Sequence, residues 1–285
     1  MPEEKKIQLG QTKSQETSTA QELQAQGLPE GEFLDTEFIV PTDDVMLPSQ
    51  GKFYANGQKS VKIKYLTAED ENILTSPELI RNGRVLDVLL ENSIIDSSLS
   101  PTEMLTGDRN ATLLALRTTG YGDEYEVKKQ CESCSETFTE QVLLSELKIK
   151  ELKVTPDGNN EFEVILPKMK IPIKFRLLTG ADENRLARVS EMGKKKINNK
   201  VSVSTLLTER FLLQIMEAKG QRDKGYIKKM ISAMPIADSL FLREYIREIE
   251  PGVDMSYTFT CTSCGKVQID DVPVTAKLFW PNANV

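Results

Sequence analysis

The sequence predicts an α+β protein built from two diverged copies of one α+β unit. Three observations support this fold class: a strand-and-helix motif that occurs twice, two identical Cys-x-x-Cys pairs, and alternating apolar stretches beside stretches with helical periodicity. With 285 residues, 39% of them hydrophobic, the chain is long enough for roughly one to three domains.

The repeated motif covers residues 63–74 and recurs at residues 175–186. Each occurrence begins in an alternating stretch that predicts a strand, formed by Val61, Ile63 and Tyr65 and then by Ile171, Ile173 and Phe175. Thr67 and Thr179 follow, each with an aspartate three residues later (Asp70 and Asp182). This spacing predicts a capped helix start in both places.

Further helices are predicted after each motif. Apolar residues at helical spacing indicate core helices, with Val85, Leu86, Leu89 and Leu90 in the first copy and Leu206, Leu207, Phe211 and Ile215 in the second. Ser76-Pro77 and Ser100-Pro101 predict additional helix starts. A later helix carries Asp108 in the first copy and Asp238 in the second, and Gly122 and Gly252 then precede the two cysteine pairs.

This order predicts three regions: a flexible N-terminal arm at 1–44, a first repeat at 45–150 and a second repeat at 151–285. The arm is rich in Gln, Glu, Ser and Thr, a composition that does not order on its own. It is either a solvated tail or an arm that orders on a partner through four apolar residues, Phe33, Leu34, Phe38 and Ile39. Near the other end, Phe279 and Trp280 either cover the core of the second copy or form a hydrophobic hook for a neighbour.

The four cysteines form two pairs with the same spacing, Cys131 with Cys134 and Cys261 with Cys264. Short apolar stretches flank each pair, so each is expected at the tip of a β-hairpin, as in a zinc knuckle. Gly265 suits such a turn, whereas Ser135 at the matching position predicts strain.

The favoured interpretation is one structural Zn²⁺ bound by all four thiolates, which would clamp the two copies together. Two knuckles from copies related by a pseudo-twofold axis could meet in this way, although 126 residues separate them. The alternatives are thiols that lie close together without metal, and redox chemistry of a thioredoxin type.

Composition argues against several functions. The chain has no histidine, which excludes Ser-His-Asp and Cys-His catalysis. Its net charge of −7 disfavours general nucleic-acid binding. No segment is apolar enough for a membrane span, and the N-terminus lacks a secretory signal, so a cytosol-like compartment is expected. No phosphate-binding loop or nucleophile motif is present in the sequence, and we expect no enzymatic activity.

Several motifs occur in an order that resembles a known family. They are Leu47-Pro48-Ser49-Gln50-Gly51-Lys52-Phe53-Tyr54, the segment 66–76, Gly107-Asp108-Arg109-Asn110, and the segment 121–125 before the first cysteine pair. This succession resembles the baseplate hub and hub-assembly proteins of contractile-tailed phages of the T-even type. The resemblance covers residues 46–140 directly and the remainder through the repeat.

The resemblance implies a non-enzymatic protein that is assembled in the host cytoplasm and located in the virion tail baseplate. Its partners would be other tail and hub proteins, with no nucleic acid and no membrane span. Whether it stays as a structural hub subunit or acts as a transient tail-assembly chaperone, for example for the tape-measure protein, is open at this point. A zinc-ribbon regulator that binds nucleic acid is a further alternative.

Overall fold

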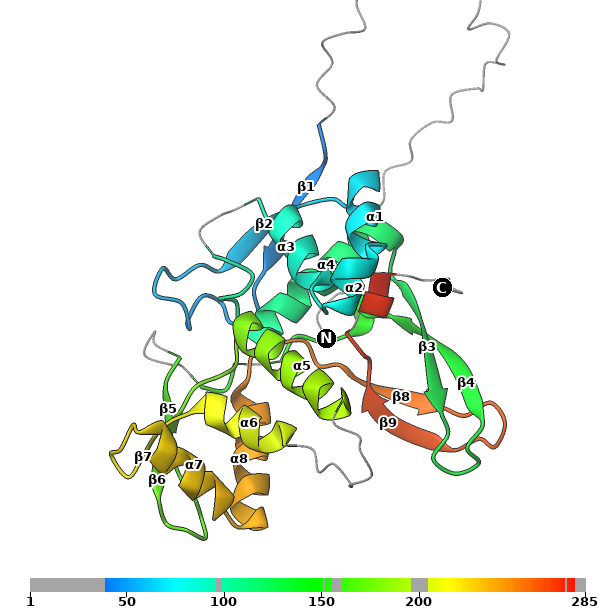
Figure 1. The fold of residues 1–285 in the computed structure, drawn as a ribbon. Helices are drawn as coiled ribbons and strands as arrows, with labels where there is room; N and C mark the ends of the chain where they lie inside the picture. The colour runs from blue at the N-terminus through cyan, green and yellow to red at the C-terminus, as the bar shows by residue number, and fades with distance from the viewer. Residues whose placement is uncertain are drawn as a thin grey trace, which may run out of the picture. The chain divides into compact units, whose positions relative to one another are not determined.

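Short antiparallel strand pairs alternate with helices along the chain (Figure 1). The structure is a computed structural model that describes residues 39–95, 99–150, 152–154, 160–195, 205–274 and 276–279. Within these ranges no helix is both long and apolar enough to cross a membrane.

The first half of the folded chain ends at residue 150. Its elements are β1 (Thr42–Met46), β2 (Ser60–Lys64), α1 (Ala68–Leu74), α2 (Pro77–Arg81), α3 (Val85–Ser93), α4 (Thr106–Tyr121), β3 (Glu124–Gln130), β4 (Thr137–Leu143) and the 3₁₀ helix η1 (Leu144–Glu146). β1 therefore begins at Thr42, three residues before the boundary at residue 45 that the composition suggested.

The second half also begins with two strands and ends with a long helix, two strands and a 3₁₀ helix, and it has one additional strand, β7. Its elements are β5 (Phe162–Ile165), β6 (Pro172–Phe175), α5 (Gly180–Lys195), α6 (Leu206–Gln214), β7 (Ile215–Ala218), α7 (Lys224–Ser232), α8 (Ile236–Ile249), β8 (Ser256–Thr260), β9 (Val267–Asp271) and the 3₁₀ helix η2 (Ala276–Phe279).

The strands form small antiparallel sheets: β1–β2, β3–β4, β5–β6–β7 and β8–β9. The protein is thus a mixed α+β fold, as the sequence predicts. β2 buries Val61 and Ile63 on one face, and β6 buries Ile173 and Phe175 in the same way. The alternation of apolar residues that predicts these strands therefore corresponds to the buried face of each sheet.

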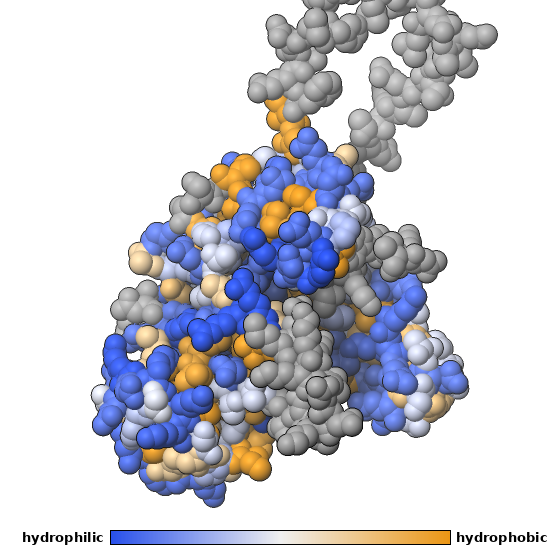
Figure 2. Space-filling view, viewed as in Figure 1, coloured by the Kyte–Doolittle hydropathy of each residue, from blue (hydrophilic) through white to orange (hydrophobic). Residues whose placement is uncertain are grey.

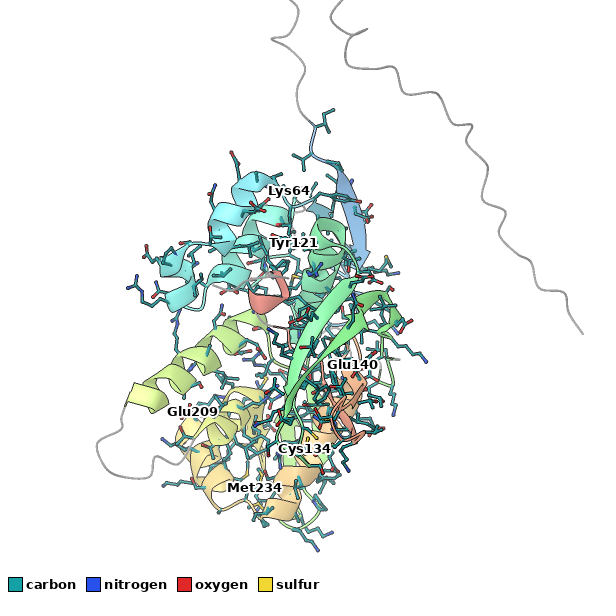
Figure 3. The ribbon with its side chains drawn as sticks, turned by 90° about the vertical axis from the view of Figure 1, so that its right-hand side faces the viewer. Lys64, Tyr121, Cys134, Glu140, Glu209 and Met234 are labelled. Carbon is teal, nitrogen blue, oxygen red and sulfur yellow. The ribbon has the colours of Figure 1, made fainter. Side chains whose placement is uncertain are left out.

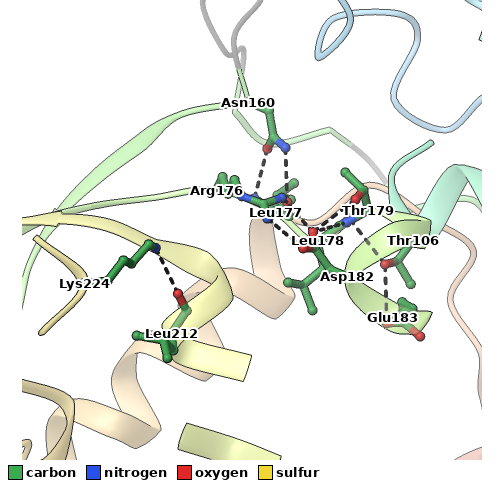
Figure 4. A network of polar contacts seen from close by, with 10 residues as sticks. All are labelled: Thr106, Asn160, Arg176, Leu177, Leu178, Thr179, Asp182, Glu183, Leu212 and Lys224. Atoms are coloured by element: carbon green, nitrogen blue, oxygen red, sulfur yellow. Dashed lines mark hydrogen bonds and ion pairs between the residues drawn. The ribbon is translucent and has the colours of Figure 1, made fainter. Parts of the chain in front are cut away.

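The predicted helix caps are confirmed at both motifs. Asp70 Oδ2 accepts hydrogen bonds from the N–H and hydroxyl of Thr67 at 2.8 and 2.9 Å. Asp182 Oδ2 accepts the equivalent bonds from Thr179 at 3.0 and 3.1 Å (Figure 4). Each aspartate therefore satisfies a donor at the start of its helix and places a negative charge at the positive helix end.

Of the two helix starts predicted at Ser-Pro pairs, the structure has the first and lacks the second. Ser76 caps α2, because its Oγ accepts from the N–H of Leu79 at 3.5 Å. The helix predicted at Ser100-Pro101 is wrong: residues 101–103 form a turn, and the next helix begins at Thr106. The N–H groups of Glu103 and Met104 donate to Ser100 O within this turn, and the carbonyls of Thr102 and Met104 accept hydrogen bonds from the start of α5.

Two apolar cores lie one in each half, and each includes side chains from the other half. The first core contains Leu278 and Phe279, both fully buried, and the Phe279 ring lies 6.4 Å from that of Tyr121 in α4. The second core contains Phe53, whose ring centroid lies 6.0 Å from that of Phe162 in β5. Phe279 thus covers the first core, whereas the sequence suggested the second.

One of the predicted core helices is only partly buried. α3 buries Val85, Leu89 and Leu90 as expected. In α6, Phe211 is buried but Leu206 and Leu207 are 38% and 40% exposed. The first turn of α6 therefore lies at the surface, although its apolar residues predicted a core position. Ile215, predicted in the same helix, is buried as a residue of β7.

Candidate metal centre

The β3–β4 and β8–β9 hairpins lie side by side, and a Cys-x-x-Cys pair lies at the tip of each (Figure 1). The antiparallel registers end at Gln130–Thr137 in the first hairpin and at Thr260–Val267 in the second. Each hairpin therefore carries its two cysteines in the turn that connects its strands. Figure 3 shows Cys134 near the end of the first hairpin, beyond Glu140.

The two turns have the same backbone hydrogen bonds. The N–H of Cys131 donates to Glu136 O at 2.9 Å, and that of Ser135 donates to Cys131 O at 3.0 Å. In the second turn the N–H of Cys261 donates to Lys266 O and that of Gly265 to Cys261 O, both at 2.9 Å. Two sequences that share the cysteines and the serine before the second cysteine, Ser133 and Ser263, therefore adopt one turn geometry.

The four sulfur atoms converge on one point. Cys131 Sγ lies 3.6 Å from Cys264 Sγ, and Cys134 Sγ lies 3.7 Å from Cys261 Sγ. All four sulfurs lie within 4.8 Å of one another. Four sulfurs at about 2.3 Å from a tetrahedral zinc ion would be about 3.8 Å apart. The arrangement therefore fits a single four-coordinate soft metal ion, and the prediction that the cysteines meet is confirmed.

Backbone groups and neighbouring thiols shift the acidity of the sulfurs in opposite directions. The N–H groups of Cys134 and Ser133 lower the pKa of the Cys131 thiol to about 6. The N–H of Glu136 acts to lower the pKa of Cys134, but desolvation and the adjacent thiols raise it to about 12. One negative charge thus forms readily, whereas four would repel one another. A divalent cation among the sulfurs would remove this penalty.

Other contacts also hold the two hairpins together. Lys129 Nζ lies 2.5 Å from Asp270 Oδ2, and the N–H of Thr260 donates to Glu140 Oε2 at 2.9 Å. The side-chain oxygen of Gln268 accepts from the N–H of Glu132 at 3.3 Å. These residues were not identified from the sequence, because their roles depend on which strand lies beside which.

The residues predicted to bind partners have different positions. Ile39 is 86% exposed, whereas Phe279 is fully buried by residues of its own chain. Phe33, Leu34, Phe38 and Trp280 lie outside the described residues. Among the predicted partner-binding positions that the structure describes, Ile39 is therefore the accessible one.

Comparison with known families identifies the class of protein. A family model described as T4 bacteriophage base plate protein matches residues 44–280. The chain belongs to this family. The match spans both halves and both hairpins of the baseplate protein, and the resemblance to T-even baseplate proteins is confirmed. Neither a curated protein sequence nor a solved structure matches the chain.

Proposed function

We propose that this baseplate protein is a structural, non-enzymatic subunit of the phage baseplate hub, in which one zinc ion clamps the two halves of the chain. The observation that supports the clamp is the convergence of four sulfurs from hairpins far apart in sequence. Zinc suits four thiolates in a tetrahedral arrangement, and such a site leaves no open position for a reacting water. The role of the ion would be to fix the orientation of the halves.

We further propose that the two halves are diverged copies of one unit, corresponding to residues 45–150 and 151–285. The long helices α4 and α8 support this idea, because each carries a fully buried aspartate in its first turn. Asp108 Oδ1 accepts from the N–H of Ser49 at 2.8 Å, just after the first Leu-Pro pair. Asp238 accepts from the N–H groups of Lys168 and Met169 at 2.7 and 2.8 Å, just after the second.

The assembly role rests on protein contacts. Family membership supports other phage tail and baseplate proteins as partners. Residues 1–44 remain a proposed arm, with Phe33, Leu34, Phe38 and Ile39 as its anchoring residues and Trp280 as a further contact near the other end. In this proposal the protein is assembled into the baseplate in the host cytoplasm and is retained in the virion tail baseplate.

The composition of purified virions tests the structural role. Mass spectrometry of particles purified to constant density is expected to detect this chain in a fixed ratio to other baseplate proteins. If the chain is abundant in infected-cell extracts but absent from mature particles, the structural role is wrong and a transient tail-assembly chaperone is the correct class.

A further inference from the structure

The outer edge of β9, the edge that faces away from β8, is an open strand edge. β8 and β9 form a two-stranded sheet, and within the described residues no third strand pairs with β9. Figure 1 shows this hairpin and the β3–β4 hairpin extending together away from the helices. An open edge presents unpaired backbone donors and acceptors, to which a strand of another chain can bind.

The hydrogen-bond pattern of the hairpin shows which residues face this edge. At the tip, the N–H of Cys261 donates to Lys266 O. Because hydrogen-bonded and non-bonded pairs alternate along an antiparallel ladder, Val267 and Ile269 lie in non-bonded pairs with their partners on β8. Their backbone N–H and C=O groups therefore point away from β8. In the part of the chain that the structure describes, no backbone hydrogen bond joins either residue to another element.

The side chains at this edge are apolar and exposed. Val267 is 53% exposed and Ile269 is 76% exposed. They lie on the face of the hairpin opposite to Phe259 and Gln268, whose buried side chains contact the β3–β4 hairpin. In the view of Figure 2 the surface of the two hairpins is mostly hydrophilic. Apolar side chains beside an open edge favour the addition of another strand.

The first hairpin lacks these apolar side chains. It has the same cysteine turn and an antiparallel ladder of the same kind, but Thr137 and Thr139 occupy the positions that Val267 and Ile269 occupy in the second hairpin. The apolar edge is thus a property of β9 and not of the turn that both hairpins share. The β4 positions provide matched controls for changes in β9.

The sequence of β9 is complementary to itself in the antiparallel direction. Its central residues are Lys266, Val267, Gln268, Ile269 and Asp270. In a pair of copies with a twofold axis at Gln268, Val267 of each copy lies opposite Ile269 of the other. The same register places Lys266 of each copy opposite Asp270 of the other, so opposite charges meet on both sides of the axis.

This register also agrees with the hydrogen-bond pattern of the open edge. Val267 and Ile269, whose backbone groups point outward, become hydrogen-bonded pairs, and the two symmetric pairs form about four backbone hydrogen bonds. A shift of one residue in either direction would pair Val267 with a residue whose backbone groups already bind β8. A shift of two residues would separate Lys266 from Asp270. One register therefore satisfies both the backbone and the charges.

We propose that this protein self-associates through the outer edge of β9, which pairs antiparallel with β9 of a second copy about a twofold axis at Gln268. A second copy is favoured over an unrelated strand because the permitted register brings Lys266 and Asp270 together twice. Asp270 also contacts Lys129 of its own chain, but its side chain is 52% exposed and accessible to a second copy. The inference goes beyond the proposed function and does not depend on it.

Sedimentation velocity of the full chain over a wide range of concentrations tests the inference. The wild type should show a reversible equilibrium between monomer and dimer. Ile269→Lys places a charge within the paired edge and should weaken dimer formation about tenfold or more. Ile269→Ser, which removes the apolar contact without adding a charge, should weaken it in the same direction. Thr139→Lys at the matched exposed position of β4 should associate like the wild type.

Two charge variants test the register. Lys266→Glu makes both charged positions of the edge acidic, and Asp270→Lys makes both basic. Each variant alone should associate more weakly than the wild type, because like charges lie opposite each other in the dimer. An equal mixture of the two variants should recover association, since the mixed dimer has opposite charges at both positions.

Three results would overturn the inference: a wild type that stays monomeric at every concentration, equal weakening by Ile269→Lys and Thr139→Lys, or a mixture that associates no better than its components. If the wild type is monomeric and Ile269→Lys, but not Thr139→Lys, is lost from virions, the edge binds a different baseplate protein, which also contradicts self-association.

Two further measurements keep the outcomes distinct. Circular dichroism and metal content should be the same in every variant as in the wild type, which separates a lost contact from a lost fold. If the chain is monomeric but retains its metal and its place in the virion, the self-association is wrong and the proposed function stands.

Discussion

At the scale of single residues, the two cysteine turns differ where the backbone is most restricted. Ser135 has a φ of 61° and Gly265 has a φ of 72°. Both lie in the left-handed region, which glycine adopts freely and serine does not. A Cβ added at Gly265 would meet nothing within 4 Å, so the difference between the turns is conformational rather than steric.

This pair of turns gives a reciprocal prediction. Ser135→Gly should raise the free energy of unfolding by about 1 kcal/mol, and Gly265→Ser should lower it by a similar amount. Urea denaturation of the zinc-loaded proteins measures both values. A shift of the same sign in the two variants would contradict the shared turn geometry.

The environment of Asp182 lowers the pKa of its carboxyl group. Although burial alone would raise its pKa, hydrogen bonds from Arg176 and from the N–H and hydroxyl of Thr179 lower the pKa below its ordinary value. Since the folded-state pKa lies below that of the unfolded chain, the ionised carboxylate stabilises the fold. That contribution is complete above the unfolded value of about 4 and is lost as the pH falls through the folded value.

Asp182→Asn should therefore lower the free energy of unfolding by about 2 kcal/mol at neutral pH. The difference from the wild type should shrink as the pH falls below about 4. Urea denaturation across this range measures the difference, with Asp44→Asn on the exposed strand β1 as the control. A difference that stays constant with pH would show that the charge of Asp182 does not contribute.

At the scale of elements, α4 packs closely against the segment that follows α8. A Cβ added at Gly107, the second residue of α4, would lie 1.8 Å from the carbonyl oxygen of Pro251 and 2.9 Å from the Cα of Gly252. Both neighbours are backbone, which cannot move away as a flexible side chain would. Glycine at position 107 is therefore required for the two halves to meet.

Gly107→Ala should lower the free energy of unfolding by about 3 kcal/mol, because backbone of one half or the other must shift. Gly225→Ala is a matched control, since Gly225 is also the second residue of a helix, α7. Its added Cβ would meet only the side chain of Asp223, at 3.2 Å. Equal stability of the two variants in thermal denaturation would rule out the close approach.

The elements that could be predicted from the sequence are those with local causes. The Thr-x-x-Asp caps and the alternating strands depend on neighbouring residues. The spacing of the four cysteines alone predicts that they are metal ligands. The helix predicted at Ser100-Pro101 is wrong: the turn there has local hydrogen bonds to Ser100 O, and the carbonyl of Thr102 also accepts a hydrogen bond from α5, far along the chain. The same holds for Phe279, whose burial in the first core follows from packing and not from its local sequence.

At the scale of the whole molecule, three connections join the two halves in addition to the close approach of α4 and the polar contacts between the hairpins. Phe53 and Phe279 each enter the core of the opposite half. Isolated β-bridges pair Leu105 with Thr179 and Ile149 with Val253. The cysteine turns form the third connection. An ion bound by the four thiolates would stabilise this connection by more than any single contact between the hairpins. In our account this combination gives a rigid subunit whose outer surface is available to neighbouring proteins.

The metal content of the purified chain tests this account most directly. Elemental analysis of protein prepared without chelators should find about one zinc ion per chain, with four coordinating sulfurs by X-ray absorption. Cys131→Ser and Cys264→Ser should each release zinc and lower the melting temperature. A wild-type protein that holds no metal with all four thiols reduced, and that melts like both variants, would contradict the zinc clamp.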